Sequence, residues 1–247
     1  MQRYFVDDFK DNYFYISKED RHHIVKVMRL KVDDEIICVN NGKTAICRIE
    51  EITDENVCAK VVKWEEGSVE LPVKIAIASG LPKGDKLEWI IQKGTELGAS
   101  VFIPFAASRS VVKWDDKKAE KKVERWNKIA KEAAEQSHRQ LVPEVKHPIT
   151  LKSLIDQSKS YDYTLIAFEE DAKQGETSRL HATLKGIQNG QSILFVFGPE
   201  GGLTEEEVSL LKENGFQSCG LGPRILRTET APLYALAAVS YQIELMR

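Results

Sequence analysis

The sequence predicts an α/β protein of two domains, a small β-rich domain over residues 1–70 and a larger domain over residues 71–247 in which strands and helices alternate. In the first part, Asn41 and Gly42 separate two alternating apolar segments, which is a strong hairpin signal because both turn residues need a positive φ. A polar break at 65–68 follows. Beyond it, short apolar strands alternate with amphipathic helices, a pattern typical of a mostly parallel sheet covered on both faces.

The first domain is expected to contain a short helix and three strands. Ser17 is a favourable N-cap residue, and the acidic side chains after it suit the first turn of a helix that ends near residue 28. Alternating apolar residues predict strands at 35–40, 44–52 and 56–64. The Asn-Gly turn joins the first two of these strands.

The larger domain is expected to follow a repeated strand–helix pattern. Strands are predicted at 73–79, 101–105, 163–168, 192–197 and 216–221, and helices at 83–97, 116–137, 204–214 and from Thr230 onward. Thr204 and Glu207 have the spacing of a capping box. Pro232 falls in the first turn of the last helix, where its missing N–H costs little.

The composition is that of a soluble globular protein, with 42% hydrophobic and 30% charged residues. No apolar run approaches the roughly 20 residues that span a bilayer, and no secretory signal is visible. We therefore expect a cytoplasmic protein with no membrane partner. The four cysteines form no CxxC pair, and His22 and His23 have no nearby ligand partners, so we expect reduced thiols and no metal site.

The charge distribution leaves room for a nucleic-acid partner. The net charge of −3 counts mildly against one, because nucleic-acid binders are often strongly basic. Residues 109–139, however, contain 10 lysines and arginines against 6 acidic residues, a local net charge of +4. The acidic excess lies elsewhere in the chain, for example in the glutamates at 205–207.

Two glycine-containing segments carry the strongest functional signal. Residues 195–204 read FVFGPEGGLT, residues 220–232 read GLGPRILRTETAP, and each lies between a predicted strand and a predicted helix. Ligands bind at such strand ends in open parallel sheets, and glycine lets the backbone approach them closely. A ligand-free tight connection is about equally plausible for the first segment, and a surface loop with an internal salt bridge is plausible for the second. Neither is a phosphate loop or a GxGxxG turn, and Glu200 would repel an anion.

These two segments resemble the paired signatures of the SPOUT class of RNA methyltransferases. More narrowly, they are similar to those of the ribosomal small-subunit RNA uridine-N3 methyltransferase family. The stretch ILRTETA at 225–231 is the specific part, whereas GPEGG at 198–202 is shared by several related groups. Further motifs stand in the expected order along essentially the whole chain, among them RYFV at 3–6, KGDK at 83–86 and QKGTELG at 92–98.

The resemblance implies a fold, a cofactor and partners. It implies an N-terminal PUA-like, OB-related β-barrel that helps to hold RNA, and a C-terminal SPOUT domain with a trefoil knot at about 192–235. It implies a homodimer that acts on 16S ribosomal RNA or the 30S subunit with S-adenosylmethionine as cofactor. The cofactor-binding residues would be Phe197, Gly198, Pro199, Glu200, Gly201, Gly202, Leu221, Gly222, Ile225, Leu226, Arg227, Thr230 and Ala231. Backbone groups of Leu221, Leu226 and Ala231 would suit the adenine ring.

Methylation of uridine N3 requires that its proton be accepted and that the uracil anion be stabilised. Glu200 or Glu229 is the predicted base and Arg227 the predicted anion stabiliser. Glu229 could equally be a helix N-terminal carboxylate that favours the macrodipole, and Arg227 could form a salt bridge to either glutamate. The predicted RNA-binding residues are Arg29, Lys83, Lys86, Lys93, Arg109, Arg125 and Arg139, each of which could instead be an ordinary solvated side chain.

Three other functions compete with uridine-N3 methylation. A related SPOUT enzyme would act on a ribose 2′-hydroxyl or on transfer RNA, and the ILRTETA stretch with the N-terminal barrel argues against it. A non-catalytic RNA-binding ribosome assembly factor would need degenerate cofactor loops, whereas both segments remain rich in glycine and charge. A nucleotide-binding α/β enzyme is disfavoured by the absence of a phosphate loop.

Overall fold

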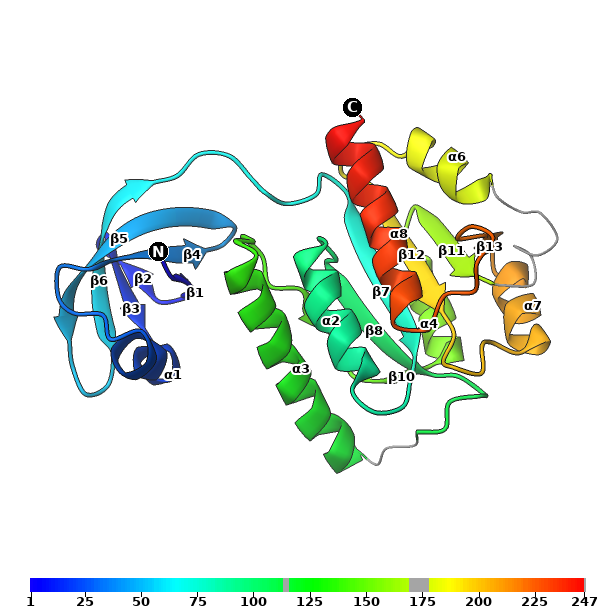
Figure 1. Cartoon of the computed structure of the whole chain (residues 1–247), viewed down its shortest axis with the longest axis horizontal. Coiled ribbons are helices and arrows are strands. Elements are labelled where there is room, and N and C mark those ends of the chain that lie inside the picture. Colours follow the sequence, from blue (N-terminus) through cyan, green and yellow to red (C-terminus); the bar gives the residue numbers. More distant parts are fainter. Residues whose placement is uncertain (113–115, 169–177, 247) are drawn as a thin grey trace. The chain divides into compact units, whose positions relative to one another are not determined.

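The computed structural model describes residues 1–112, 116–168 and 178–246. Its contacts divide the chain into two compact units (Figure 1). Unit 1 comprises Met1–Glu70 together with Ala134–Leu141, and unit 2 comprises Leu71–Ala133 together with Val142–Arg247. The segment 134–141 therefore joins the N-terminal unit although more than sixty residues of unit 2 separate the two in sequence.

Unit 1 is built on a curled six-stranded sheet in the order β1-β4-β5-β6-β3-β2. The strands are β1 Arg3–Phe5, β2 Phe9–Lys10, β3 Tyr13–Ile16, β4 Glu35–Asn40, β5 Lys43–Ile52 and β6 Val57–Trp64. β1 pairs with β4 in parallel and the other neighbours are antiparallel. The three predicted strands are confirmed as β4 to β6, and so is the hairpin turn, in which Asn41 and Gly42 have φ of 47° and 75°. The first three strands were not predicted.

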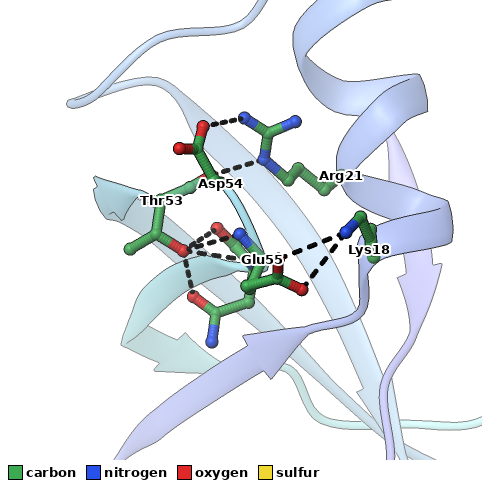
Figure 2. A network of polar contacts seen from close by, with 6 residues as sticks. Lys18, Arg21, Thr53, Asp54 and Glu55 are labelled. Atoms are coloured by element: carbon green, nitrogen blue, oxygen red, sulfur yellow. Dashed lines mark hydrogen bonds and ion pairs between the residues drawn. The ribbon is translucent and has the colours of Figure 1, made fainter.

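The predicted helix after Ser17 consists of α1 Lys18–His22 followed by the π-helical turn η1 His23–Val27. Ser17 occupies the N-cap position, but its side chain makes no capping hydrogen bond. Side chains of α1 instead bind the turn between β5 and β6 (Figure 2). Lys18 Nζ lies 3.2 Å from Glu55 Oε1, and Arg21 donates to the carbonyl of Thr53.

A buried polar network joins the segment 134–141 to the rest of unit 1. The Arg139 side chain is 5% exposed, and its Nη2 lies 2.6 Å from Oε2 of Glu70. The same carboxylate accepts the backbone N–H of Gln140 at 2.7 Å. From β1, Nη1 of Arg3 donates to the carbonyl of Arg139 at 3.1 Å. Burial makes each of these bonds costly to break, because the group left behind would lose its partner without regaining water.

Unit 2 contains an all-parallel sheet in the order β10-β8-β7-β12-β11-β13, with β9 beside β8. The strands are β7 Lys74–Gly80, β8 Val101–Ala106, β9 Glu144–Val145, β10 Ile149–Thr150, β11 Tyr163–Ala167, β12 Ser192–Phe197 and β13 Gln217–Cys219. All residues of β12 are buried. This is expected of a strand that has a parallel neighbour on each side and helices above and below.

Helices cover both faces of this sheet, as predicted. They are α2 Lys86–Glu96, α3 Asp116–Gln136, α4 Leu151–Ser158, α6 Arg179–Gly186, α7 Glu205–Glu213, α8 Thr230–Ser240 and the π-helical turn η2 Tyr241–Leu245. Alternate strand residues enter two separate cores: Ile75 and Ile77 of β7 pack in the cluster that includes α2 and α8 residues, and Ala76 packs in the cluster with α4 and α7. No helix in the described residues is long and apolar enough to cross a membrane.

Candidate functional site

The two glycine-containing segments meet in unit 2. Both line a cleft of about 680 Å³ together with Ala167, the last residue of β11, and Phe168, which follows it. A second hollow of about 250 Å³ shares Phe168 and Ile225 with that cleft and extends along residues 221–226. The site therefore lies where β11 and β12 end and where the loop after β13 leads into α8, which is the usual place for a ligand in an open parallel sheet.

Close backbone packing explains the glycines of the first loop. A Cβ on Gly198 would lie 2.8 Å from both the carbonyl carbon of Gly202 and the amide nitrogen of Leu203. The loop is closed by the amide of Gly202, which donates to the carbonyl of Pro199 at 2.8 Å, and Gly202 itself has a φ of +70°. A side chain at Gly198 would force the loop apart, and one at Gly202 would strain the backbone because of its positive φ.

The second loop is bonded directly to the first. The hydroxyl of Thr228 donates to the carbonyl of Gly198 at 2.6 Å. The carbonyl of Arg227 accepts the amides of Thr230 and Ala231 at 2.8 and 3.0 Å, which turns the chain into α8. Thr228 was not among the predicted site residues, because only the folded chain brings its hydroxyl to Gly198.

Lys86, at the start of α2, lies between the two predicted acids. Its Nζ is 3.0 Å from Oε1 of Glu200 and 3.4 Å from Oε2 of Glu229. The amide of Lys83 also donates to Glu200, at 3.1 Å. Burial would raise the pKa of Glu200, but the Lys86 ammonium and the backbone donors outweigh it and hold the pKa below its ordinary value. The hydrogen bond that Lys86 donates to Glu200 raises the pKa of Lys86. The carboxylate of Glu200 and the ammonium of Lys86 are therefore both charged at neutral pH.

Arg109 binds the backbone of the first loop. Its Nη1 donates to the carbonyl of Gly201 at 2.8 Å. The neighbouring residue Ser108 donates its amide and its hydroxyl to Oε1 of Glu207, at 2.7 and 3.0 Å. The other oxygen of Glu207 accepts the amide of Thr204, which completes the predicted capping box of α7. Glu207 thus ties the start of α7 to the loop that carries Arg109.

The structure brings nearly all predicted cofactor-binding residues to the cleft and its extension. The lining residues among them are Phe197, Gly198, Pro199, Glu200, Gly201, Gly202, Leu221, Gly222, Ile225, Leu226, Arg227 and Ala231. Thr230 is not a lining residue; its amide caps the turn into α8. Arg227 is exposed and forms no ion pair within the described residues, so it is not the partner of Glu200 or Glu229. Glu229 occupies the N-cap position of α8.

The predicted RNA-binding residues have different surroundings. Lys86 and Arg109 line the cleft. Lys83 has an exposed side chain, and its backbone amide donates to Glu200, which also lines the cleft. Lys93 pairs with Glu96 and Arg125 pairs with Glu88, while Arg29 is an exposed residue with a φ of 57°. Arg139 is buried and bound to Glu70, so its guanidinium serves the fold of unit 1 and cannot reach a phosphate without rearrangement.

Comparison with known proteins identifies similar sequences and structures. A family model described as an RNA methyltransferase domain matches residues 69–240, and one described as an RNA methyltransferase PUA domain matches residues 16–62. The chain is 55% identical to the ribosomal RNA small subunit methyltransferase E of Bacillus subtilis, over 100% of this chain and 99% of that protein. It is 33% identical to the protein of that name from Mesomycoplasma hyopneumoniae, over 96% and 97% of the two chains.

Two solved structures with bound cofactor are also similar. One is a ribosomal RNA small subunit methyltransferase E from Neisseria gonorrhoeae bound to S-adenosyl methionine, with a TM-score of 0.84 and 30% identity over 98% of this chain and 97% of the other. The second is a methyltransferase from Legionella pneumophila in complex with the same cofactor, with a TM-score of 0.85 and 28% identity over 97% of each chain.

Proposed function

This chain belongs to the ribosomal RNA small subunit methyltransferase E family, and from that premise we propose that it methylates N3 of a uridine in 16S ribosomal RNA with S-adenosylmethionine as donor. The observation that carries the proposal is the meeting of both signature loops in one cleft, held together by the hydrogen bond from Thr228 to Gly198. Each loop alone could be a simple connector. Their joint lining of a single cleft is what a cofactor site requires.

The residues of the cleft fit this cofactor. Phe168, Leu221 and Ile225 provide apolar surface next to exposed backbone groups of the second loop, which suits a flat purine ring. Glu200 and Glu205 also line the cleft, and their carboxylates suit a cation. S-adenosylmethionine, when bound, supplies a methyl group on a positively charged sulfur for transfer to a nucleophile.

The chain itself must position the uracil and manage one proton. We propose that Arg227, exposed at the cleft and free of ion pairs among the described residues, stabilises the negative charge that develops on the base. A carboxylate with a lowered pKa is a poor proton acceptor, so Glu200 is better suited to holding Lys86 in place. Glu229 is then the proposed base. Its Oε2 is buried and accepts no hydrogen bond within the described residues, and the Lys86 ammonium lies 3.4 Å from it.

The family also suggests properties that concern the whole protein. We propose that residues 1–70 act as a PUA-like RNA-binding domain, that the chain forms a homodimer in the cytoplasm, and that the segment at about 192–235 is knotted. The proposed contacts to RNA phosphates are the exposed cations Arg29, Lys83 and Arg125 and the half-buried Lys93, with Lys86 and Arg109 nearer the reacting base. Light scattering of the purified protein would contradict the dimer by giving the mass of one chain.

The function is tested by incubating the protein with labelled S-adenosylmethionine and 30S subunits that lack the modification, followed by digestion of the RNA and identification of the nucleoside. We expect 3-methyluridine in 16S RNA, and at least a hundredfold slower transfer in Arg227→Ala if one transition-state charge contact is lost. Lys159→Ala, which removes an exposed charge at the C-cap of α4, is the matched control and should be fully active.

Other outcomes identify the competing functions. A different methylated nucleoside would keep the enzyme class and refute the uridine-N3 assignment. Binding of the cofactor without transfer to 30S subunits, free 16S RNA or transfer RNA would instead favour a non-catalytic assembly factor.

A further inference from the structure

Unit 1 contains a second hollow that the proposed methyl transfer does not use. It has a volume of about 680 Å³ and lies at the end of the β4–β5 hairpin and of β6. Its lining residues are Phe9, Asn40, Asn41, Gly42, Lys43, Trp64, Glu65, Gly67 and Gln140, all of which belong to unit 1. We call this hollow the barrel pocket.

Two aromatic rings form a corner of the barrel pocket. Phe9 and Trp64 are each 38% exposed, their ring centroids are 5.6 Å apart, and their planes are nearly perpendicular at 85°. The fully buried Phe14 supports both, with centroids 4.6 Å from Phe9 and 6.1 Å from Trp64. A flat ligand that stacks on one of the two rings would therefore point its edge at the other. Exposed aromatic faces on a rigid sheet are the usual platform for unpaired bases.

A fixed hydrogen-bond acceptor lies in the same pocket. Gln140 is 8% exposed, and its Nε2 donates to the carbonyl of Gly67 at 3.0 Å and to the hydroxyl of Thr44 at 3.2 Å. Because a carbonyl can only accept, these bonds determine which end of the amide is the nitrogen. The opposite end, Oε1, has no hydrogen-bond partner among the described residues. It can accept an N–H from a ligand without any rearrangement of the side chain.

The charges at the rim suit a neutral ring attached to an anionic chain. Lys43 is exposed in the hairpin and its ammonium has no ion-pair partner in the described part of the chain. Glu65 lines the pocket as well, so the hollow itself would not hold a phosphate. A base inside the pocket would keep negative charge away from Glu65, and its backbone phosphate could lie near the ammonium of Lys43.

We propose that the barrel pocket binds one unpaired nucleobase of the RNA substrate, stacked in the Phe9–Trp64 corner and hydrogen-bonded through an amino or imino group to Oε1 of Gln140. This rests on the proposed function only in taking RNA as the substrate. A proline or aliphatic side chain of a partner protein would fill the corner but leave Gln140 and Lys43 unused, so RNA is the better match.

The proposal is tested with full-length Trp64→Leu, which keeps an apolar side chain but removes the flat ring. Stacking of one base is worth enough that we expect the KM for 30S subunits to rise about tenfold. The kcat at saturating subunits and the Kd for S-adenosylmethionine should stay unchanged, because the cleft residues belong to unit 2. Trp64→Phe should restore most of the affinity, and Val62→Ala, an exposed apolar change in the same strand, should have no effect.

A second variant avoids any risk to folding. Lys43→Gln removes an exposed, unpaired ammonium, so the affinity for protein-free 16S RNA measured by filter binding should fall about threefold. The slope of log affinity against log salt concentration should become shallower by roughly one. The proposal is overturned if folded Trp64→Leu keeps a KM within twofold of the unaltered protein. It is also overturned if Trp64→Leu impairs binding to assembled subunits but not to protein-free RNA, since the occupant would then be a protein.

The proposed function and the barrel pocket can fail separately. If the unaltered protein transfers no methyl group, the proposed function fails, and filter binding of 16S RNA to Trp64→Leu and Trp64→Phe still decides the occupant of the pocket. If transfer is normal in all variants and RNA binding is unchanged, only the pocket proposal fails.

Discussion

The cleft of unit 2 and the barrel pocket of unit 1 are built from different parts of the chain. The cleft is made largely of backbone, with glycines that allow Gly198 to pack within 2.8 Å of the Gly202–Leu203 peptide. The barrel pocket is made of side chains, with Gln140 and Arg139 fixed by the largely buried carboxylate of Glu70. Substitutions should therefore damage the two regions for opposite reasons. In the cleft, an added atom would displace closely packed backbone. In the pocket, removal of a side chain would leave its hydrogen-bond or ion-pair partner unsatisfied.

The largest effect is expected from removing the guanidinium in unit 1. Arg139→Met leaves the carboxylate of Glu70, which is 15% exposed, without its ion-pair partner. Breaking a buried pair in this way costs about 3 to 5 kcal/mol. Native-state hydrogen exchange of the β4–β6 amides measures the loss. Arg125→Met, whose side chain is 65% exposed in its pair with Glu88, should cost less than about 1 kcal/mol. Equal costs for the two variants would show that burial does not determine the strength of these ion pairs.

The next largest effect is expected from a single added methyl group in unit 2. Gly198→Ala must displace backbone atoms of the loop, so we expect S-adenosylmethionine to bind about a hundredfold more weakly by calorimetry, a loss of roughly 2.7 kcal/mol. Gly186→Ala at the end of α6 is the control, because its Cβ would meet no atom within 4 Å. Unchanged cofactor binding in Gly198→Ala would mean that the loop is not held in the described conformation.

A smaller difference between the two units is expected at two helix N-termini, each of which has a hydroxyl residue at the N-cap position. Thr204 accepts the amide of Glu207 in a complete capping box, whereas the side chain of Ser17 makes no capping bond. Thr204→Ala should therefore destabilise unit 2 by about 1 kcal/mol, measured by urea unfolding. Ser17→Ala should change the stability of unit 1 by only a few tenths of that value. A loss of about 1 kcal/mol in Ser17→Ala would show that the serine caps α1 in solution.

The smallest effect on stability is expected at Lys86. Lys86→Met removes the ammonium next to Glu200, so the pKa of this carboxyl should rise, which carboxyl NMR titration can follow. Because the folded-state pKa of Glu200 is lowered, the pair stabilises the protein above the ordinary pKa of glutamate, and this stabilisation is lost as pH falls through the folded-state pKa. Exposure of both side chains keeps it below about 1 kcal/mol. Lys93→Met, which affects the pair with Glu96, should leave the Glu200 titration unchanged.

The same contrast explains how much could be predicted from the sequence. The glycine loops and the capping box of Thr204 depend on neighbours in sequence, so the pattern indicated them correctly. The strands β1 to β3 are two to four residues long and were missed, because so short a segment carries little periodicity. Arg139 was predicted as an RNA contact, whereas it is buried against Glu70, a partner almost seventy residues away.

The barrel pocket could not be predicted by any local pattern. Phe9, Trp64 and Gln140 come from three distant parts of the sequence, and only the curled sheet and the segment 134–141 bring them together. The pairing of Lys86 with both Glu200 and Glu229 is of the same kind. Sequence motifs identify sites built from backbone more readily than sites built from dispersed side chains.

The return of the chain to unit 1 at 134–141 limits how this protein can be cut or recombined. A fragment that stops at Glu70 would expose that carboxylate without Arg139 and would lack Gln140, which lines the pocket. Grafting residues 1–70 onto another enzyme would therefore transfer an incomplete module. Insertions or deletions that preserve both units should instead be tolerated at surface loops that lie away from the three crossings near 70, 133 and 142. The N-terminal unit is inherited together with the end of α3, as one piece that is discontinuous in sequence.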